Sequence, residues 1–572
     1  MEALPPFWGT PTSLWTACLG AVLIFTLLSY LSAQSRRYSP TNSKKIPRIF
    51  YDPAIRAIFT GSLGNLPALH SCYGDLIHLT FIGEPAILVG GLPNIRAVLT
   101  NDNFQADLPK PMVKLLGQGN LQTVHGKEHA RDRKILSPIF TPTNLKGYIP
   151  RVAILAKNTV KSWEIASTNN TCGKNTSILA YTEIRKYVLR VGLELVLGFD
   201  VTRTSTSEYD RMSQLFTDLW AGFFTVPVDV PGSNYRKALK ARDELQKTIL
   251  SNLEVLMEEE SLAMASSEKI KEEEKINEEV GNEGNTVGGG GRAALELLME
   301  AKDEDGKPVT KDHIMTLVTS LMLGALDTTA TSLMLAVRRL ALHPEVFSKA
   351  RAEQADIIAQ HGPDFTFDTL RHMRYLDGIL KETIRLQSPV QLVFRRAVRD
   401  CEIGGGYLIP AGRKILVHVG EAIVNDERWL RSSDNKNNAD TSTIKKKITR
   451  GGAPIEKNAT NDELSLANGG KQQLLSDDTS TTTKTTSFTK DSFMPERWLS
   501  DQGAKTGGWL PFGGGPRLCP GQQLAWTEMK LLLATLARGY TVELIDPNEK
   551  WDVFPLQKPK QGMPIRVTRK NG

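Results

Sequence analysis

Cysteine is scarce in this sequence of 572 residues, and the five that occur are widely spaced, with no Cys-x-x-Cys pair. An odd number of widely spaced cysteines without such a pair argues against a disulfide framework and against a structural zinc site. A single cysteine can still be a metal ligand or a nucleophile, and its neighbours decide which. The cysteines are Cys18, Cys72, Cys172, Cys401 and Cys519.

A concentration of one charge is also missing. The chain has 70 basic and 63 acidic residues, a formal net charge of +7, and no dense Lys/Arg block, so no nucleic-acid partner is expected. A content of 40% hydrophobic and 23% charged residues is that of a folded globular protein. No repeat of about 20–50 residues supports a solenoid. This composition is compatible with one large unit, which we expect over residues 51–572.

One long apolar run lies near the N-terminus. Residues 14–33 are uncharged and mostly apolar, long enough at about 1.5 Å per residue to cross a bilayer core of about 30 Å. We predict a short segment 1–13, a transmembrane anchor 14–33 and a basic linker 34–50. Basic residues follow the run, so the catalytic unit is expected in the cytosol. A cleaved secretory signal is the alternative, although no charged segment precedes the run.

Two stretches differ in composition from a folded globular domain and are predicted to be flexible insertions. Residues 258–292 are strongly charged and then glycine-rich, as in a solvated helix extension that leads into a loop. Residues 431–490 are rich in Ser, Thr, Asn, Asp and Lys and bury too little apolar surface to fold. Elsewhere helical periodicity dominates: Lys311–Leu342 reads as a buried core helix, and Leu76–Phe81 with Ala86–Val89 as strands of a small sheet.

The strongest motif is PFGGGPRLCPG, residues 511–521, which precedes a helical pattern. It has the spacing F-x-x-G-x-R-x-C-x-G, formed by Phe512, Gly515, Arg517, Cys519 and Gly521. Glycines let a loop wrap closely around a large planar ligand, and backbone N–H groups at a helix start favour a thiolate. Such a loop can hold a thiolate against a metal.

This segment resembles the haem-binding loop of the cytochrome P-450 family. The resemblance implies a mainly α fold with small β-sheets, behind a single N-terminal transmembrane helix. It implies a haem b cofactor with Cys519 as the axial thiolate ligand of the iron, O₂ as co-substrate, and electrons supplied indirectly by NADPH. Arg517 would contact a haem propionate, and Phe512 would belong to the same cofactor-binding loop.

Within the predicted core helix, Gly324–Thr329 resembles the oxygen-activation motif of this family. Asp327 and Thr328 would then help to deliver protons to bound oxygen, and a small residue beside them would leave space for O₂. Ala325 replaces the usual second glycine. The alternative is that these side chains only bond backwards to helix carbonyls.

Two further motifs support the resemblance. Glu382 and Arg385 lie three residues apart on one helical face and resemble the E-x-x-R pair, which in the family is joined by the arginine of a P-E-R segment. Arg497 occupies that position. These three residues would be structural partners that fix the loop beneath the haem, and the fork of an arginine suits this role better than a lysine.

The propionates should have ligands from two other segments. GKEHARDRKILSPIF, residues 126–140, resembles the family's W-x-x-x-R helix, with Arg133 in the propionate-binding position and His129 in place of tryptophan. An imidazole N–H can still donate a hydrogen bond to a propionate. In residues 394–410, Arg395 is the first choice for another contact and Arg396 the alternative.

His129 in the tryptophan position and the run of residues 226–242 narrow the resemblance to the clan of retinoic-acid, brassinosteroid and taxane hydroxylases. It implies a monooxygenase that inserts oxygen into C–H bonds of a small apolar or amphiphilic substrate, terpenoid, sterol, retinoid-like or otherwise prenyl-bearing. Segments 112–122 and 389–394 should line its pocket, with Lys110, Lys114 or Gln391 available for a polar head.

No G-x-G-x-x-G motif stands in a strand-turn-helix context, so electrons should come from a partner, an NADPH-dependent flavoprotein reductase. Arg131 and Lys134 are candidates for its docking face. The expected location is the endoplasmic reticulum membrane, with a plastid or other organelle as the alternative. Two rival functions stay open: a haem-thiolate isomerase or dehydratase that needs no reductase, and a non-enzymatic haem-binding sensor.

Overall fold

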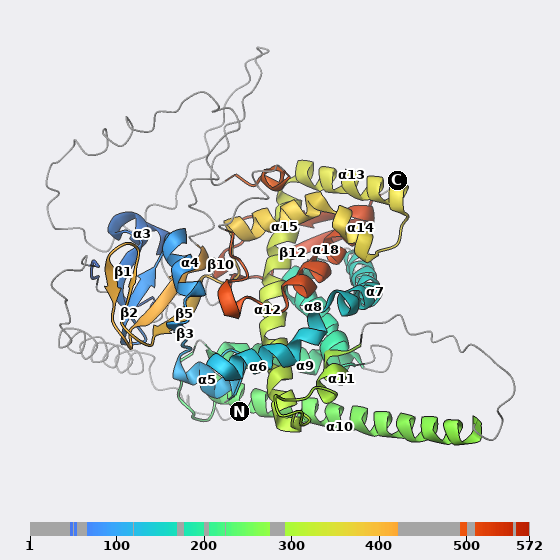
Figure 1. The fold of residues 1–572 in the computed structure, drawn as a ribbon. Coiled ribbons are helices and arrows are strands. Elements are labelled where there is room, and N and C mark those ends of the chain that lie inside the picture. The colour runs from blue at the N-terminus through green and yellow to red at the C-terminus, as the bar shows by residue number, and fades with distance from the viewer. Residues whose placement is uncertain are drawn as a thin grey trace, which may run out of the picture. The chain divides into compact units, whose positions relative to one another are not determined.

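A computed structural model describes residues 46–49, 51–53, 56, 66–117, 119–168, 177–199, 205–223, 225–274, 292–420, 492–499, 509–552 and 556–570 (Figure 1). The predicted anchor 14–33 and the predicted insertion 431–490 lie outside the described residues. So does most of the linker 34–50. The described residues, apart from Ser492, belong to one compact unit.

Helices make up most of the described chain and surround α12, which spans Lys311–Leu342. The helices α7, α8, α15 and α18 form much of the core with α12 (Figure 1). The remaining bounds are α3 Leu66–Tyr73, α4 Leu92–Thr100, α5 Lys110–Leu116, α6 Gly126–Leu136, α7 Pro142–Thr168, α8 Ala180–Val196, α9 Thr206–Phe223, α10 Asn234–Glu274, α11 Ala294–Met299, α13 Pro344–His361, α14 Phe367–His372, α15 Arg374–Leu386 and α18 Gln522–Gly539, with 3-10 turns η1 Ser137–Phe140, η5 Pro495–Trp498 and η6 Gly515–Arg517.

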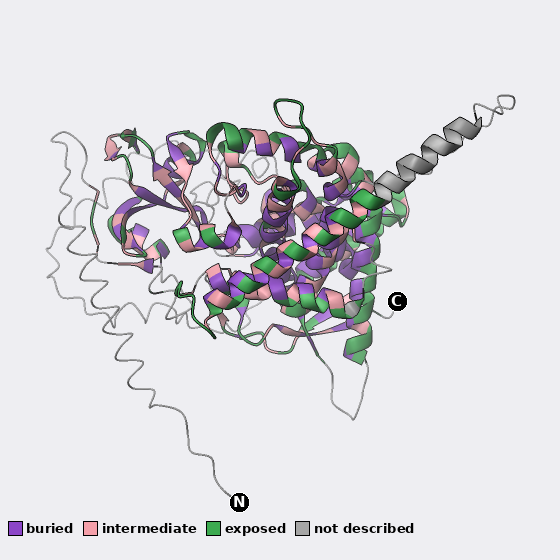
Figure 2. Cartoon of the chain, turned by 90° about the horizontal axis from the view of Figure 1, so that it is seen from below, coloured by how far each residue is buried: buried purple, intermediate pink, exposed green. Residues whose placement is uncertain are grey.

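The core helix α12 begins and ends where the sequence predicts. Thr310 caps its start by accepting a hydrogen bond from the backbone N–H of His313, and His343 ends it before Pro344 opens α13. Of the described helices, α12 alone is long and apolar enough to cross a membrane, but 78% of its most apolar window is buried inside the protein. It is therefore the core helix of this fold (Figure 2).

A five-stranded sheet in the order β1-β2-β8-β5-β3 combines strands of residues 76–106 with strands of residues 392–418. Both of its faces are covered, because Ile87 and Val89 of β2 pack into one apolar cluster and Leu88 into another. The strands are β1 Leu76–Phe81, β2 Glu84–Val89, β3 Phe104–Ala106, β4 Ile178–Leu179, β5 Leu392–Ala397, β6 Cys401–Ile403, β7 Tyr407–Ile409, β8 Lys414–His418, β9 Tyr540–Leu544, β10 Trp551–Asp552, β11 Lys558–Pro559 and β12 Pro564–Arg569. The mainly α fold with small sheets agrees with the prediction from the sequence.

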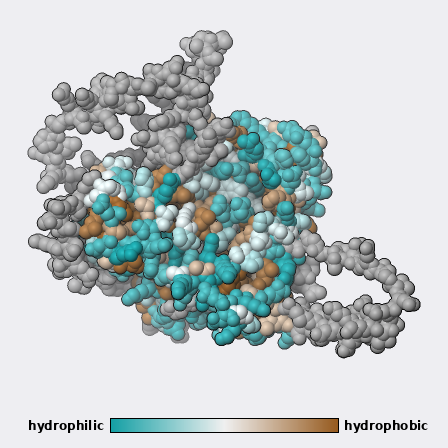
Figure 3. Space-filling view, in the orientation of Figure 1, coloured by the Kyte–Doolittle hydropathy of each residue, from teal (hydrophilic) through white to brown (hydrophobic). Residues whose placement is uncertain are grey.

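Helix α10 runs into the first predicted insertion. It continues to Glu274, so the charged first part of residues 258–292 is helical, and residues 275–291 lie outside the described chain. On the face drawn in Figure 3, apolar residues form several small groups among hydrophilic ones.

Candidate active site

The cysteine loop lies between Trp509 and α18, pressed against the end of α4. Gly513 and Gly515 have φ of 79° and 65°, a left-handed conformation that favours glycine. A Cβ on Gly515 would lie 2.5 Å from the carbonyl oxygen of Leu99. Glycine is therefore required here both for the backbone angle and for the close approach.

The thiol of Cys519 is half-buried in this loop, one turn before α18. Its backbone N–H donates to the carbonyl of Phe512 at 3.0 Å, which closes the loop around it. Burial raises the pKa of the Cys519 thiol, while the N–H groups of Gly521 and Gln522 and the charge of Arg133 act in the opposite direction. A thiolate here has hydrogen-bond donors that suit a metal ligand.

Aromatic side chains in and beside the cysteine loop pack against one another. The ring of Phe512 packs edge-on against Trp526, with centroids 5.6 Å apart, and Trp509 packs against both. The indole N–H of Trp526 donates to Asp377 of α15 at 2.5 Å. The loop is thus fixed to two helices, α15 and α18.

The guanidinium groups of Arg395, which is buried, and of Arg517, which is half-buried, come together beside the loop. Arg517 donates to the carbonyl oxygens of Leu121 and Val124 and to Nδ1 of His125, the last at 3.0 Å. Burial, and then the charge of Arg517, lower the pKa of Arg395 to about 10. Among the described residues, the hydrogen bonds of these two arginines go to carbonyl oxygens and a histidine nitrogen, and neither pairs with a carboxylate. Two neighbouring positive charges without an anion leave a place for a negatively charged group.

Helix α6 adds two more groups to this region. His129 is buried, and burial, followed by the charges of Arg517 and Arg133, lowers its pKa to about 4. It is therefore neutral near pH 7 and offers one ring N–H. Burial lowers the pKa of Arg133, and the charge of Cys519 opposes this, so Arg133 lies close enough to the thiol to interact electrostatically.

Neighbouring arginines of β5 have different environments. Arg396 is partly exposed and pairs with Glu84 at 3.0 Å and with Asp107 at 2.7 Å. Arg395 is 8% exposed and, among the described residues, donates only to the carbonyl of Phe394, at 2.9 Å. Because successive strand residues point to opposite faces, only Arg395 lies on the side of Arg517.

The predicted oxygen-activation segment has an accessible and a buried face. Gly324 is exposed, and Ala325 and Thr328 are half-buried, whereas Asp327 and Thr329 are buried. The Thr328 hydroxyl donates to the carbonyl of Gly324 at 2.7 Å, which is the backward bond considered above as the alternative. Thr328 nevertheless lies on the same accessible side of α12 as Gly324.

The Asp327 carboxylate is held by a partner that the sequence analysis did not identify. Arg185 of α8 places its Nε 2.7 Å from Oδ1 of Asp327 and its Nη2 3.3 Å from Oδ2. Arg185 also donates to the Thr217 hydroxyl at 2.6 Å. Burial raises the pKa of Asp327, and Arg185 opposes that rise. Spacing carries no signal for this pair, because 142 residues separate its members.

The three predicted structural partners form one buried network. Arg385 donates to both carboxylate oxygens of Glu382, at 2.8 and 2.9 Å, and Arg497 donates to Oε1 at 3.1 Å. The indole of Trp498 and the backbone N–H of Met494 complete the set at 3.0 and 3.1 Å. The carboxylate thus fixes the segment 494–498 to α15. Neither the role of Trp498 in this network nor the contact of His125 with Arg517 was predicted from the sequence.

This set of groups fits a haem. The half-buried thiol could ligate the iron, and Arg395 and Arg517, which pair with no carboxylate among the described residues, could bind the propionates. A mainly helical fold with a thiol loop and neighbouring cationic groups is that of a haem-thiolate protein.

The sequence profile of the cytochrome P-450 family matches residues 43–433 and 489–566, so the chain belongs to this family. It is 27% identical over 482 residues to cytochrome P-450 26B1 of Xenopus tropicalis, covering 82% of this chain and 76% of that protein. It is 25% identical over 492 residues to beta-amyrin 11-oxidase of Glycyrrhiza uralensis, covering 85% and 81%. The solved structure of retinoic-acid-bound cyanobacterial CYP120A1 has a TM-score of 0.67 at 20% identity, covering 92% of this chain and 100% of that chain.

Proposed function

We propose that this cytochrome P-450 oxidises C–H bonds of a small, largely apolar, isoprenoid-derived substrate. The observation that carries the proposal is the half-buried Cys519 thiol beside the buried Arg395 and the half-buried Arg517, neither of which pairs with a carboxylate in the described part of the chain. The accessible face of α12, with Gly324 and Thr328, supports it as the place where oxygen and substrate would meet.

Each group of the site has a proposed task. Cys519 ligates the iron, and Phe512 supports the loop that presents it. Arg133, Arg395, Arg517 and the neutral His129 bind the propionates, and His125 orients Arg517 through its ring nitrogen. When bound, the haem supplies the activation of O₂ and the oxidation of the C–H bond. Glu382, Arg385 and Arg497 hold the adjoining segment in place.

Asp327 and Thr328 are the proposed proton-handling pair. The Thr328 hydroxyl lies on the accessible face and can accept a hydrogen bond while it donates to Gly324. The Asp327 carboxyl is buried and paired with Arg185, so its protonation depends on that ion pair. Protons would pass from the buried side of α12 to the accessible side through this pair.

The substrate class is supported by relatives and by the location of two lysines. One relative is a beta-amyrin 11-oxidase, an enzyme whose name describes a triterpenoid substrate. Lys110 and Lys114, considered above for a polar head group, are both exposed to solvent, which favours a pocket without a lysine at this segment. Gln391 is half-buried and donates to the carbonyl of Ser388 at 2.8 Å.

Membrane attachment and a reductase partner belong to the same proposal. Residues 14–33 are proposed as the anchor in the endoplasmic reticulum, with the catalytic unit in the cytosol. Val226, Val228 and Val230 follow α9 and are 53%, 47% and 48% exposed, an arrangement that suits contact with a bilayer. Lys134 is exposed and Arg131 is partly exposed, available for docking an NADPH-dependent flavoprotein reductase.

The ferrous carbon monoxide difference spectrum tests the ligand assignment. Membranes with the wild type should give the Soret shift of a thiolate-ligated haem, and Cys519→Ala should lose it. Cys401→Ala is the matched control, because Cys401 is also half-buried and should leave the spectrum unchanged. A histidine-type spectrum in the wild type would contradict the ligand and the function built on it.

Consumption of NADPH separates the proposed function from its two rivals. A monooxygenase should consume NADPH in step with product only when reductase, O₂ and substrate are all present. An isomerase or dehydratase would form product without reductase, and a haem-binding sensor would form none. Terpenoid and prenylated alcohols and acids are the first compounds to screen, by the spectral shift on binding and then by turnover.

A further inference from the structure

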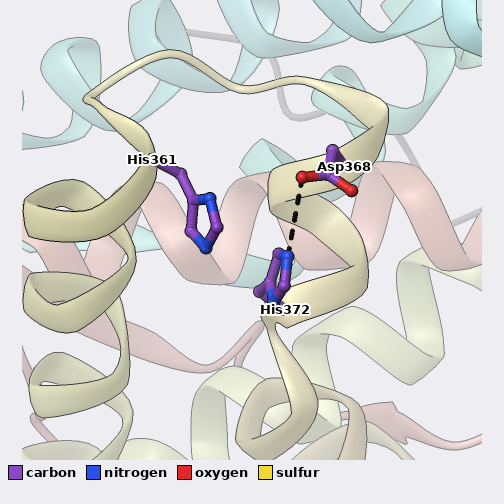
Figure 4. A group of neighbouring side chains, drawn as sticks. All are labelled: His361, Asp368 and His372. Carbon is purple, nitrogen blue, oxygen red and sulfur yellow. Dashed lines mark ion pairs between the residues drawn. The ribbon is translucent and has the colours of Figure 1, made fainter.

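A second group of ligand-type side chains lies away from the cysteine loop, where α13 ends and α14 begins. His361 is the last residue of α13, and Asp368 and His372 lie one turn apart on α14. One ligand atom of each residue lies within 4.8 Å of the others. Figure 4 shows the two imidazoles facing one another, and Nε2 of His372 is 3.5 Å from Oδ2 of Asp368.

The backbone that carries these side chains is fixed by contacts of its own. Gly362 ends α13 in a left-handed conformation, with φ of 83°. A capping box between Thr366 and Thr369 fixes the start of α14. Arg538 of α18 donates to the carbonyl of Pro363 in the connecting loop at 2.6 Å. The distance between the two helix ends is therefore set by the fold, and only side-chain rotation is left to adjust.

We propose that His361, Asp368 and His372 bind a divalent transition-metal ion, with Zn²⁺ as the best match. Ligand atoms around tetrahedral zinc at bonds of about 2.1 Å lie about 3.4 Å apart. His372 and Asp368, at 3.5 Å, already have that spacing, and the ligand atom of His361 lies within 4.8 Å of both. The two imidazole planes are 20° from parallel, with centroids 4.2 Å apart, so one ring must turn to direct its lone pair at a shared ion. Both histidines are exposed, so no core packing opposes that turn.

The donor set selects the class of ion. Two imidazoles and one carboxylate suit Zn²⁺, Cu²⁺ or Ni²⁺, whereas Mg²⁺ and Ca²⁺ prefer oxygen ligands alone. A pocket beside the cluster is lined by His361, His372, Asp356, Glu353 and Lys349, so water can reach the two imidazoles. Its lining carries more acidic than basic groups, which favours a cation.

A bound ion would connect two consecutive helices that pack into the same core. It would join α13 to α14, and α14 leads through Met373 directly into α15, the helix of Glu382. Lys530 of α18 also donates to the carbonyl of Leu370 in α14, at 3.4 Å. The expected effect is a metal-dependent gain in thermal stability, separate from the haem chemistry.

Isothermal titration of Zn²⁺ into the haem-loaded protein, purified without a polyhistidine tag, tests the proposal. Saturable binding of one ion per chain is expected. Loss of even an outer-shell partner typically costs about 10–100-fold in metal affinity, so His361→Ala and His372→Ala should each cost at least that much. Asp368→Asn should weaken binding as well. His343→Gln, which changes a histidine outside the cluster, and Arg371→Ala, which changes α14 alone, are the controls.

X-ray absorption at the zinc edge of the wild type gives an independent result. The expected first shell has two imidazole nitrogens and oxygen ligands, and Zn²⁺ should raise the melting temperature of the wild type but not of His361→Ala. The proposal is overturned if the wild type shows no saturable zinc binding. It is also overturned if the His361→Ala/His372→Ala double variant binds zinc as tightly as the wild type.

Discussion

Arg185 holds the buried carboxylate of Asp327 across the contact between α8 and α12, with 2.7 Å between Nε and Oδ1. Both side chains are less than one tenth exposed, and a third group, the Thr217 hydroxyl, accepts from the same guanidinium at 2.6 Å. The proposed proton-handling acid therefore depends for its charge on a residue of another helix.

Arg185→Gln should destabilise the protein and impair turnover. Removal of one partner of a buried ion pair typically costs about 3–5 kcal/mol, because the other charge remains buried. The pKa of Asp327, already raised by burial, should rise further. Urea unfolding measures the first effect, and product formed per NADPH consumed measures the second.

Two variants make the Arg185 test specific. Lys186→Gln removes the neighbouring, one-third-exposed lysine, whose ion pair with Glu183 should contribute no more than about 1 kcal/mol. Adding Asp327→Asn to Arg185→Gln should restore part of the lost stability, since the unpaired charge is gone. Equal losses in Arg185→Gln and Lys186→Gln would contradict the assignment.

Glu382→Gln should lower the free energy of unfolding by about 3–5 kcal/mol and reduce haem content, because five hydrogen bonds from four residues converge on this buried carboxylate. Chemical denaturation and the ratio of Soret to protein absorbance measure the two effects. The matched control is Glu543→Gln, which breaks a surface pair with Arg566 and should cost at most about 1 kcal/mol. A loss no larger than that of the control would show that the network is not needed.

Gly515→Ala should prevent haem incorporation, because the new Cβ would lie 2.5 Å from the carbonyl oxygen of Leu99. Gly232→Ala is a control that has the backbone strain without the clash. The φ of Gly232 is 85°, but nothing lies within 4 Å of a Cβ added there. Gly232→Ala should cost about 1–2 kcal/mol and leave haem content normal. Gly539→Ala has neither problem and should be neutral. The pyridine haemochrome assay ranks the three variants.

Stability should fall as the pH is lowered below about 6.5, owing to His418 of β8. Burial, followed by the charge of His70, lowers the pKa of His418 to about 3. The folded state therefore binds this proton more weakly than the unfolded chain does. The contribution of His418 to the free energy of unfolding is fully present above the pKa of the unfolded chain. It is lost as the pH falls toward 3, at about 1.4 kcal/mol per pH unit for one group.

Urea unfolding between pH 5 and pH 8 measures this slope. His418→Gln should reduce it, whereas His343→Gln, which changes a histidine at the end of α12, should leave it unchanged. A steeper loss in His418→Gln than in the wild type would contradict the assignment. His78, whose pKa burial lowers to about 4, should supply much of the slope that remains.

The local motifs could be interpreted from the sequence because each is a contiguous stretch with a physical requirement of its own. The glycines around Cys519 are needed where the chain turns left-handed, and the apolar run 311–342 had to be a helix that is buried on most faces. The E-x-x-R pair lies within one helical turn, so its contact follows from helix geometry. These features are determined within about 30 residues of chain.

Tertiary structure decided every contact between segments that are far apart in sequence. Arg185 reaches Asp327, and His125 reaches Arg517, only because the helices and the cysteine loop pack together. Which of Arg395 and Arg396 can bind a propionate depended on which face of β5 lies toward Arg517. The periodicity of a helix or a strand predicts contacts only within that element. Packing alone therefore determines which distant charges become neighbours and which remain free to bind a ligand.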